Sequence, residues 1–233
     1  MPQNVLITGA NRGLGLELTR ILLQQAHRIF AINRRESEAL LQLRDEFPDD
    51  LLLYSADVTD EPAIADIMRR IGEEFGHLDL VINNAAVHLE HSKPELEQVD
   101  FSVYLPTFSI NAVAPLIVIK HALPLLRRGN GKLIANISSE AGGIGTAWRK
   151  NEYSYCMSKA ALNMASRLLQ NAYKEEGIKV LALHPGWFSS DMGGSQAPIT
   201  TRQAAQDVAK LLTKTWSLDG PVYVDPEGKA LAW

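Results

Sequence analysis

The sequence YCMSK, residues 155–159, places a tyrosine four residues ahead of a lysine. Residues four apart lie on the same face of a helix, so Tyr155 and Lys159 would lie side by side. An ammonium group beside a phenol favours the phenolate and lowers the pKa of the phenol from its usual value of about 10. Such a tyrosine could exchange a proton near neutral pH. The same spacing also occurs in surface helices that do no chemistry, so the surrounding sequence has to decide between the two interpretations.

Other polar positions could complete a proton-transfer site. Ser139 follows a predicted strand in NISSEAGG and could hold a carbonyl oxygen for Tyr155. Ser138 competes for that role, because successive strand residues point to opposite faces, and either serine could instead cap a turn. Asn111 lies four residues before Pro115, which has no amide to offer the Asn111 carbonyl, so the helix should bend there. The freed carbonyl could hold a water molecule, or the bend could be purely structural.

A glycine-rich turn follows the first predicted strand. It reads TGANRGLG, residues 8–15, with Gly9, Gly13 and Gly15 in the spacing GxxxGxG. Glycine allows a tight strand-to-helix turn and lets a pyrophosphate approach the backbone closely. A helix that begins near Gly13 would offer free amides and the positive end of its dipole to that group. The loop therefore predicts a dinucleotide site, although a glycine turn without a ligand is the simpler alternative.

The second predicted strand bears on which nicotinamide cofactor is bound. NAD sites commonly have an acidic residue at this point, about 20 residues beyond the glycines. Here the sequence reads AINRR, residues 31–35, without an acid, and Arg34 could bind a 2′-phosphate. Arg12 in the glycine loop could add a second positive charge. We therefore expect NADP rather than NAD, with solvated arginines as the alternative.

Short β-rich runs alternate with longer stretches of helical spacing, which predicts βαβ units and one parallel sheet with helices on both faces. We expect about seven strands and about six helices in a single domain spanning residues 1–233. The predicted strands are residues 5–8, 28–32, 51–55, 78–83, 132–138, 178–184 and 221–224. The clearest predicted helices are residues 14–22, 62–71 with Asp60 as N-cap, 97–127 and 153–176. The predicted loops 86–96, 140–152 and 186–199 all follow strands, at the edge where parallel sheets bind ligands.

Composition excludes several classes of protein. The net charge of −4 and the lack of basic runs argue against nucleic acid as a partner. No uninterrupted apolar stretch approaches the length of a membrane span, and the first residues do not resemble a secretory signal. Cys156 is the only cysteine, which rules out an intrachain disulfide and fits a cytoplasmic protein. The cluster His88, Glu90 and His91 matches no metal-ligand spacing, and no GxSxG elbow supports a hydrolase.

Taken together, these motifs resemble the short-chain dehydrogenase/reductase family over almost the whole chain. The motifs that carry the resemblance are TGANRGLG (8–15), DVTD (57–60), NNAA (83–86), Asn111, ISS (137–139), YCMSK (155–159) and HPGWFSSDM (184–192). SKAALNM (158–164), HPGWFSSDMGG (184–194) and DPEGKALAW (225–233) are most similar to the C-factor and sniffer-type carbonyl reductases. The resemblance implies a three-layer Rossmann-type fold with strand order 3-2-1-4-5-6-7. Two helices, 97–127 and 153–176, are where relatives often form a homodimer.

The resemblance also implies a role for each matching position. Tyr155 would be the general acid, Ser139 would orient the carbonyl, Lys159 would bind the nicotinamide ribose, and Asn111 would hold a relay water. The cofactor-binding positions would be Gly9, Asn11, Arg12, Gly13, Leu14, Gly15, Arg34, Asp57, Val58, Asn83, Ala85, Tyr155, Lys159, Pro185, Gly186 and Ser190. Numbering from 139 to 155 gives an interval of 16 between Ser139 and Tyr155, longer than is usual in the family.

The resulting hypothesis is an NADP(H)-dependent reductase of a small carbonyl compound. A dinucleotide-binding regulatory or signalling protein with secondary catalysis remains the alternative, as does an NAD-dependent alcohol dehydrogenase. The physiological substrate cannot be derived, because three loops of unknown shape would define its pocket.

Overall fold

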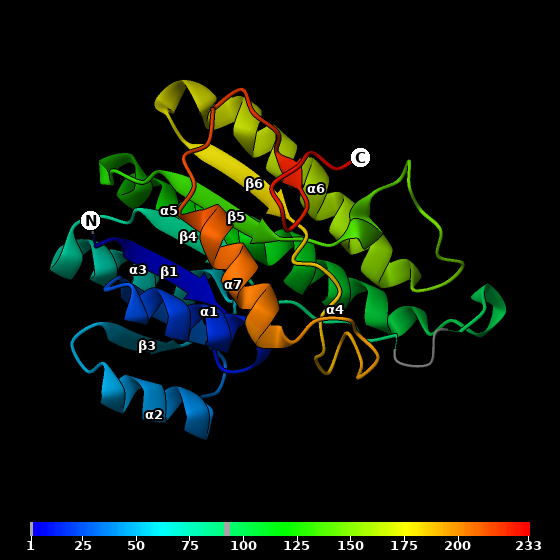
Figure 1. The fold of residues 1–233 in the computed structure, drawn as a ribbon, viewed down its shortest axis with the longest axis horizontal. Coiled ribbons are helices and arrows are strands. Elements are labelled where there is room, and N and C mark those ends of the chain that lie inside the picture. Colours follow the sequence, from blue (N-terminus) through cyan, green and yellow to red (C-terminus); the bar gives the residue numbers. More distant parts are fainter. Residues whose placement is uncertain (1, 91–93) are drawn as a thin grey trace.

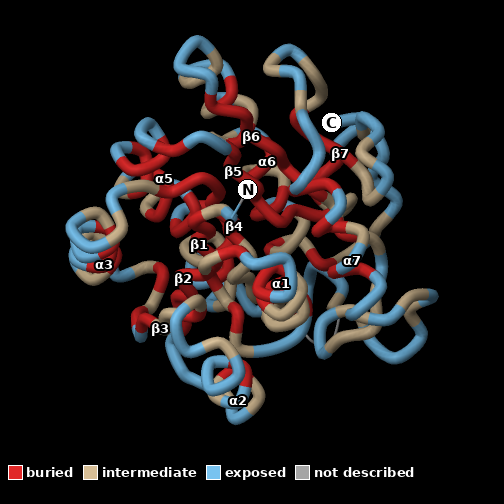
Figure 2. The backbone as a smooth tube through the Cα atoms, turned by 60° about the vertical axis from the view of Figure 1, so that its left-hand side comes forward, coloured by how far each residue is buried: buried red, intermediate tan, exposed pale blue. Residues whose placement is uncertain are grey.

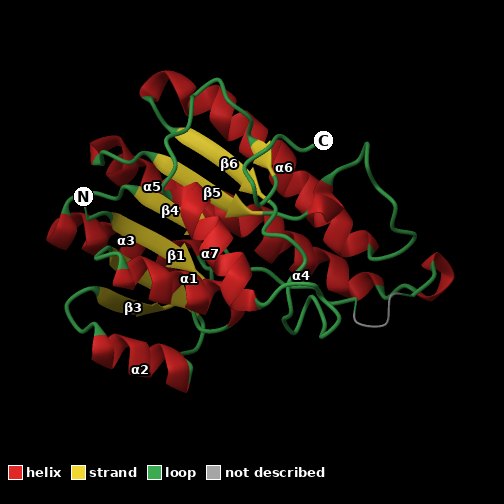
Figure 3. Cartoon of the chain, viewed as in Figure 1, coloured by secondary structure: helices red, strands yellow, loops and turns green. Residues whose placement is uncertain are grey.

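A parallel sheet of seven strands forms the centre of the computed structural model, which describes residues 2–90 and 94–233. The strands are β1 (Asn4–Thr8), β2 (Arg28–Asn33), β3 (Leu51–Ser55), β4 (Leu80–Asn83), β5 (Leu133–Ile137), β6 (Lys179–Leu183) and β7 (Tyr223–Val224). Their order across the sheet is β3-β2-β1-β4-β5-β6-β7, which confirms the prediction (Figures 1 and 3). All strands point the same way, so their carboxyl ends meet at one edge.

The strands are apolar on both faces because helices cover the sheet from both sides. In β1, Val5 and Ile7 face one helix layer and Leu6 faces the other, as the alternation along a strand requires. All five residues of β1, β5 and β6 are buried. Figure 2 shows this buried centre, with the exposed backbone confined to loops and to the outer sides of helices.

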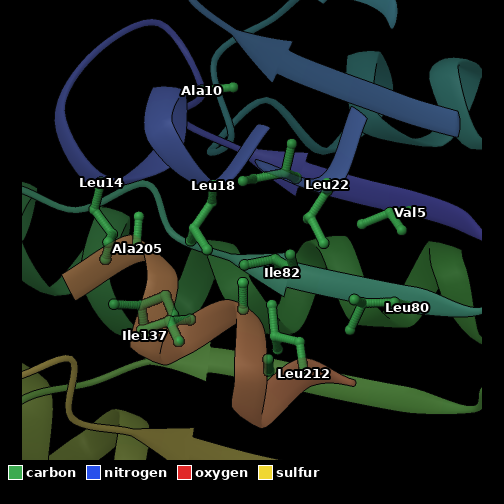
Figure 4. Packing of buried hydrophobic residues seen from close by; sticks show 14 of the residues in the cluster. Val5, Ala10, Leu14, Leu18, Leu22, Leu80, Ile82, Ile137, Ala205 and Leu212 are labelled. Atoms are coloured by element: carbon green, nitrogen blue, oxygen red, sulfur yellow. The ribbon is translucent and has the colours of Figure 1, made fainter. Parts of the chain in front are cut away.

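One helix layer consists of α1 (Gly13–Gln24), α2 (Glu38–Glu46) and α7 (Thr201–Leu212). Apolar side chains of α1 recur at intervals of four residues, Leu14, Leu18 and Leu22, and lie against the sheet and against α7. Figure 4 shows them facing the strand side chains and α7 in the core that anchors the turn after β1.

The other layer consists of α3 (Glu61–Phe75), α5 (Ala114–Arg128) and α6 (Tyr153–Tyr173), with the short α4 (Tyr104–Phe108) continuing the line of α5. Asp60 caps α3 by accepting a hydrogen bond from the Ala63 amide at 3.1 Å, as predicted. The single helix predicted over 97–127 is wrong in its first half. There the chain forms 3₁₀ turns at Leu96–Gln98 and Phe101–Val103, then α4, and then a π-helical segment, Ser109–Val113. The π segment contains Asn111, where Pro115 was expected to disturb the helix.

Within the described residues, the helical stretch Phe101–Arg128 is, by length and composition only, long and apolar enough to cross a membrane, with a mean hydropathy of 1.7 in its most apolar 18-residue window. Its side chains Val118, Ala122 and Leu126 pack against the sheet and α3, while 39% of its most apolar 18-residue window is buried.

The last residues of the chain lie against the loop that precedes α6. Ala230 forms a bridge with Val224 of β7, and the Trp233 carbonyl accepts a hydrogen bond from the Gly145 amide at 2.8 Å. The Trp233 ring lies 5.3 Å from the ring of Tyr223, centroid to centroid. The C-terminal residues therefore hold the 140–152 loop at the carboxyl edge of the sheet.

Candidate active site

Four of the residues predicted to do chemistry meet at the carboxyl edge of the sheet. Ser139 follows β5, while Tyr155 and Lys159 lie in the first two turns of α6, which packs against β6 and the turn after β5. Asn111 comes from the π-helical segment that also packs against α6. Residues from three separate segments are thus held together by the packing of α6.

The side chains of the two adjacent serines point to different sides, as the alternation along a strand predicts. Ser138 points into the protein, where its hydroxyl donates to Asn163 Oδ1 at 2.6 Å. Ser139 lies on the side of Tyr155, and its hydroxyl acts to lower the pKa of the Tyr155 phenol. The Ser139 hydroxyl donates to Glu140 Oε2 at 2.6 Å and accepts from the Ala141 amide at 3.2 Å. Ser139 therefore caps a turn and also shares the site with Tyr155.

The expected lowering of the Tyr155 pKa is wrong for this structure. Burial around the hydroxyl raises the pKa of Tyr155 to about 12, and the nearby Glu140 carboxylate acts in the same direction. The Lys159 ammonium lies 5.7 Å from the centre of the phenol ring and does not offset burial. Tyr155 is consequently a neutral phenol at physiological pH, which is the form that donates a proton.

Lys159 is the most buried cation of the site, with 2% of its surface exposed. Its ammonium donates to the Ile137 carbonyl, the last residue of β5, at 2.8 Å. Burial lowers the pKa of Lys159 to about 8. The side chain keeps its positive charge beside Tyr155 below that pH.

Asn111 uses its side chain to hold the loop after β4. Its amide oxygen accepts from the Val87 amide and its amide nitrogen donates to the Val87 carbonyl, both at 2.8 Å. The same nitrogen donates to Ser158 Oγ at 3.0 Å, one residue before Lys159. These contacts tie the π-helical segment to α6, while the relay water expected at the Asn111 carbonyl stays a prediction.

The glycine loop has the shape that a pyrophosphate needs. Gly9 has a φ of +71° and Gly13 one of +55°, a region that favours glycine. A Cβ on Gly15 would lie 2.2 Å from the Gly9 carbonyl oxygen, whereas one on Gly13 would meet nothing within 4 Å. The loop is therefore tight on its inner side and open at Gly13. No side chain caps the first turn of α1, so its amides can face an anion.

Two residues that sequence reasoning did not single out hold this loop in place. Asn84 donates from its amide nitrogen to the carbonyls of Thr8, at 3.0 Å, and Gly9, at 2.9 Å. The Thr8 hydroxyl accepts from the backbone amides of Asn84 and Ala85, each at 3.1 Å. Their signal in the sequence is position: Thr8 ends β1 and Asn84 follows its neighbour β4.

The ends of β2 and β3 form the expected site for the adenosine half of a cofactor. Arg34 is exposed, and its guanidinium lies 3.8 Å from the carboxylate of Asp57. Asp57 is fixed by hydrogen bonds from the Thr59 amide and hydroxyl at 2.9 and 2.7 Å. The side chain of Asn33 is buried, yet neither of its amide atoms has a hydrogen-bond partner. Buried amides usually have partners, so Asn33 fits a site that a polar ligand completes.

Several predicted cofactor residues contribute backbone or structure rather than an open side chain. Leu14 and Val58 are buried in the two halves of the apolar core, so only their backbone can meet a ligand. Asn83 donates to Asn136 Oδ1 at 2.8 Å across the paired strands β4 and β5, a contact that joins the centre of the sheet. The Asn11 carbonyl accepts from the Ser37 hydroxyl at 2.6 Å.

The 186–199 loop faces the glycine loop across the site. Gly186 has a φ of +84°, directly after Pro185, and turns the chain as it leaves β6. The Ser190 hydroxyl accepts from the Gly193 amide at 2.9 Å. Arg12 forms an ion pair with Asp191, so the positive charge expected for a 2′-phosphate is partly engaged by this loop.

The other residues considered for metal or thiol chemistry are His88, Glu90, His91 and Cys156. No group of three potential metal-ligand side chains occurs in residues 2–90 and 94–233, and His91 lies outside the described residues. Burial raises the pKa of the Cys156 thiol, which disfavours a reactive thiolate.

The glycine loop and the proton-transfer residues, meeting at one edge of a parallel sheet, define an oxidoreductase of the dinucleotide-binding α/β class. The family model described as short chain dehydrogenase matches residues 3–199. The chain therefore belongs to the short-chain dehydrogenase family. It is 34% identical over 158 residues to the C-signal of Myxococcus xanthus, covering 68% of this chain and 94% of that protein. It is 31% identical over an alignment of 253 residues to the short-chain dehydrogenase srdF of Neurospora crassa, covering 98% and 97%.

Solved structures of carbonyl reductases share the fold over the whole chain. The carbonyl reductase Sniffer of D. melanogaster is similar at a TM-score of 0.92 and 29% identity, with 100% of both chains covered. The NADPH-bound carbonyl reductase from chicken fatty liver is similar at a TM-score of 0.88 and 30% identity, covering 100% of this chain and 99% of that one. A carbonyl reductase from Pseudomonas aeruginosa in complex with NADP is similar at 0.83 and 28% identity, with 100% of both chains covered.

Proposed function

We propose that this chain is an NADP(H)-dependent reductase of small carbonyl compounds, with alcohol oxidation as the reverse reaction. The overall reaction is C=O + NADPH + H⁺ giving CH–OH + NADP⁺. One observation carries the proposal: Ser139, Tyr155 and Lys159 meet at the same sheet edge as the glycine loop after β1.

Each side chain of the site has a different role in proton transfer. A bound nicotinamide would supply the hydride. Tyr155 donates the proton to the substrate oxygen, and its raised pKa keeps that proton available at neutral pH. Ser139 holds the oxygen beside the phenol, and the Lys159 ammonium stabilises the negative charge that the departing proton leaves on the ring. Asn111 fixes the helix segment behind them through Val87 and Ser158.

The preference for NADP rests on the end of β2. Arg34 offers a guanidinium fork there, and Asn33 offers a buried amide without a partner. Neither residue carries the negative charge that would repel a 2′-phosphate. The carbonyl reductases from chicken fatty liver and from P. aeruginosa are described with NADPH and NADP, respectively.

Replacing Tyr155 by phenylalanine tests the proposal. We expect Tyr155→Phe to reduce turnover of aldehydes and ketones by about 10³-fold or more, because the proton donor is lost. NADPH binding should stay within a few-fold of wild type, since the glycine loop is untouched. The measurements are NADPH oxidation over a carbonyl panel and a fluorescence titration with NADPH, with NADH in parallel and expected to bind more weakly. Near-wild-type turnover of the variant would refute the assignment.

Similarity to the C-signal favours one alternative, a signalling protein that binds a dinucleotide and whose catalysis is secondary. The same panel separates the two functions. Tight NADPH binding without turnover of any carbonyl would favour the signalling function over the reductase.

A further inference from the structure

Tyr223 of β7 makes a hydrogen bond that reaches the backbone of the proposed active site. Its hydroxyl donates to the Ser139 carbonyl at 2.7 Å, although the two residues are 84 positions apart in the chain. Tyr223 is 2% exposed and Ser139 is 8% exposed, so the bond lies inside the protein. The last strand of the sheet is thereby tied directly to the residue proposed to hold the substrate oxygen.

We propose that Tyr223 is a positioning residue: its hydroxyl fixes the backbone of Ser139, so that the serine side chain leaves the sheet edge on the side of Tyr155. This inference rests on the proposed function, because it assigns Tyr223 to the placement of Ser139 for the reaction. Tyr223 acts through Ser139 and takes no part in the transfer of the proton itself.

The Ser139 carbonyl lies where the sheet gives way to a turn. The Ser138 amide still donates to the Leu183 carbonyl of β6, at 2.8 Å. Ser139 is extended, with φ −160° and ψ 154°, and its carbonyl accepts from the Gly142 amide of the following turn at 3.0 Å. A bond made within the turn moves with the turn, whereas the bond from Tyr223 ties the same carbonyl to the sheet. Buried carbonyls need such donors.

Tyr223 is itself held in place, so it can serve as a fixed point. The His184 amide of the chain after β6 donates to the Val224 carbonyl at 2.9 Å, and the Leu231 amide donates to the Tyr223 carbonyl at 2.9 Å. The Trp233 ring packs 5.3 Å from the Tyr223 ring, centroid to centroid. Backbone bonds on both sides and a ring contact therefore restrain the phenol that reaches Ser139.

The residues after β7 support the same turn at a second point. Trp233 accepts a hydrogen bond from the Gly145 amide, and a Cβ on Gly145 would lie only 3.0 Å from the Trp233 carbonyl oxygen. The loop that follows Ser139 thus rests closely on residues 230–233. Tyr223 fixes the start of this loop and Trp233 fixes its middle.

A bond to the backbone suits a serine whose hydroxyl has to change partners. The Ser139 hydroxyl donates to Glu140 Oε2 at 2.6 Å in the structure. A hydroxyl group rotates about its Cβ–Oγ bond to suit its partner, so the same proton can turn to a bound carbonyl oxygen. Tyr223 restrains the main chain and leaves that rotation free.

Replacing Tyr223 by phenylalanine removes the hydroxyl and keeps the ring. We expect Tyr223→Phe to lower kcat/KM for a small aldehyde about tenfold, because Ser139 then holds the substrate oxygen less well aligned with Tyr155. The loss should appear mainly in kcat, since alignment matters most in the transition state. NADPH affinity, measured by fluorescence titration, should stay unchanged because the glycine loop is untouched.

A double-mutant cycle with Ser139→Ala shows whether Tyr223 acts through the serine. In the Ser139→Ala background, Tyr223→Phe should lower kcat/KM no further, because the side chain that it positions is already absent. A merely structural role would lower the rate by the same factor in both backgrounds. Single-turnover measurements at high enzyme concentration keep the weak activity of the Ser139→Ala variants measurable.

Hydrogen exchange gives a readout that does not depend on activity. Peptides that cover residues 139–147 should exchange faster in Tyr223→Phe, because the turn loses its tie to β7, while peptides of α1 and α3 should keep their rates. The matched control is Tyr173→Phe, the same substitution at the opposite end of α6 from Tyr155. It should change neither the kinetics nor the exchange of residues 139–147.

Equal rate losses in both backgrounds of the cycle, or unchanged exchange of residues 139–147, would overturn the inference. If Tyr223→Phe fails to fold, Trp233→Leu takes its place in the cycle, since it loosens the packing of the Tyr223 ring, and the same lack of additivity is expected. Faster exchange of residues 139–147 in a chain that reduces no carbonyl would support the tie between Tyr223 and Ser139 and overturn the reductase function.

Discussion

Lys159 is a buried cation, and none of the carboxylates in residues 2–90 and 94–233 forms an ion pair with it. The residue is 2% exposed, and its ammonium donates to one carbonyl, that of Ile137. Removing a cation from water is costly unless a charge partner compensates for it. The lowered pKa of about 8 reflects the cost of burying this ammonium group. Lys159, which the proposed reaction requires, therefore lowers the free energy of unfolding.

We expect Lys159→Met to stabilise the protein at neutral pH while abolishing its activity. The pKa of Lys159 is about 8 in the folded chain, against the usual lysine value of 10.5, so the folded state binds fewer protons between these values. Stability of the wild type therefore rises with pH over this interval. Methionine removes the cost, by at most about 3 kcal/mol at neutral pH.

Urea unfolding of both proteins at neutral pH and at about pH 10 measures this difference. These two conditions lie on either side of the Lys159 pKa of about 8. The advantage of the variant should shrink at the higher pH. A variant that is less stable than wild type at neutral pH, with a gap independent of pH, would contradict the burial argument.

Residue identities at the site could be predicted, but their charge states could not. Ser139, Tyr155 and Lys159 were assigned from spacing because strand ends and helical faces follow simple periodicities. The sign of the Tyr155 pKa shift depends on how deeply its hydroxyl is buried and on the position of Glu140. Neither quantity is a local property of the sequence, so the prediction of a lowered pKa failed.

At the scale of elements, α6 determines where Tyr155 lies. Its buried face is largely polar, and several of these polar side chains bond other parts of the protein. Asn163 accepts from Ser138 at 2.6 Å and donates to the Gly142 carbonyl at 3.1 Å. Farther along, Gln170 accepts from the Val180 amide at 2.8 Å. These directional bonds fix the rotation and the axial position of the helix more sharply than apolar packing would.

Asn163→Leu should therefore affect stability and catalysis together. We expect a loss of about 1–3 kcal/mol in the free energy of unfolding, because the Ser138 hydroxyl and the Gly142 carbonyl lose a buried partner. The value of kcat should fall more than the affinity for NADPH, since the helix that carries Tyr155 moves while the glycine loop stays. Chemical unfolding and steady-state kinetics measure the two effects.

The matched control is Asn171→Leu, the same substitution at an exposed position of α6. It should change neither quantity appreciably. Equal losses in both variants would mean that α6 is sensitive to leucine itself, not to the bonds of Asn163.

The predicted elements fail where hydrogen bonds to distant residues override local preference. The strands, α1 and α3 followed from apolar periodicity. The stretch from Leu96 to Val113 did not, because 3₁₀ turns and a π segment replace its predicted regular helix. In this stretch Asn111 is hydrogen-bonded to Val87, and no local sequence pattern predicts that contact. Pro115 did locate the irregularity, since its missing amide is readable in the sequence.

At the scale of the whole molecule, exposed apolar side chains occur on α4, α5 and α6. The most exposed of them are Leu105, at 83%, Met164, at 60%, and Leu168, at 59%. α4 packs beside α6, so these side chains belong to neighbouring helices. Apolar patches of this kind on soluble proteins commonly mark interaction sites.

We expect a second copy of this chain to cover these side chains, giving a homodimer in solution. Light scattering coupled to size exclusion should report twice the mass of 25.7 kDa, and Leu168→Glu should shift the protein toward the monomer, because an unpaired carboxylate would be buried. A monomeric wild type at micromolar concentration would show that these side chains have another role.

The C-terminal residues that hold the 140–152 loop have a practical consequence for experiments. Trp233 touches the loop that carries Arg149, whereas β1 begins at the opposite edge of the sheet (Figure 1). A purification tag or fluorescent fusion placed behind Trp233 would pull on the segment beside Tyr155, and its effect could be mistaken for weak intrinsic activity. Fusions are better joined ahead of Asn4, where added chain leads away from the chemistry.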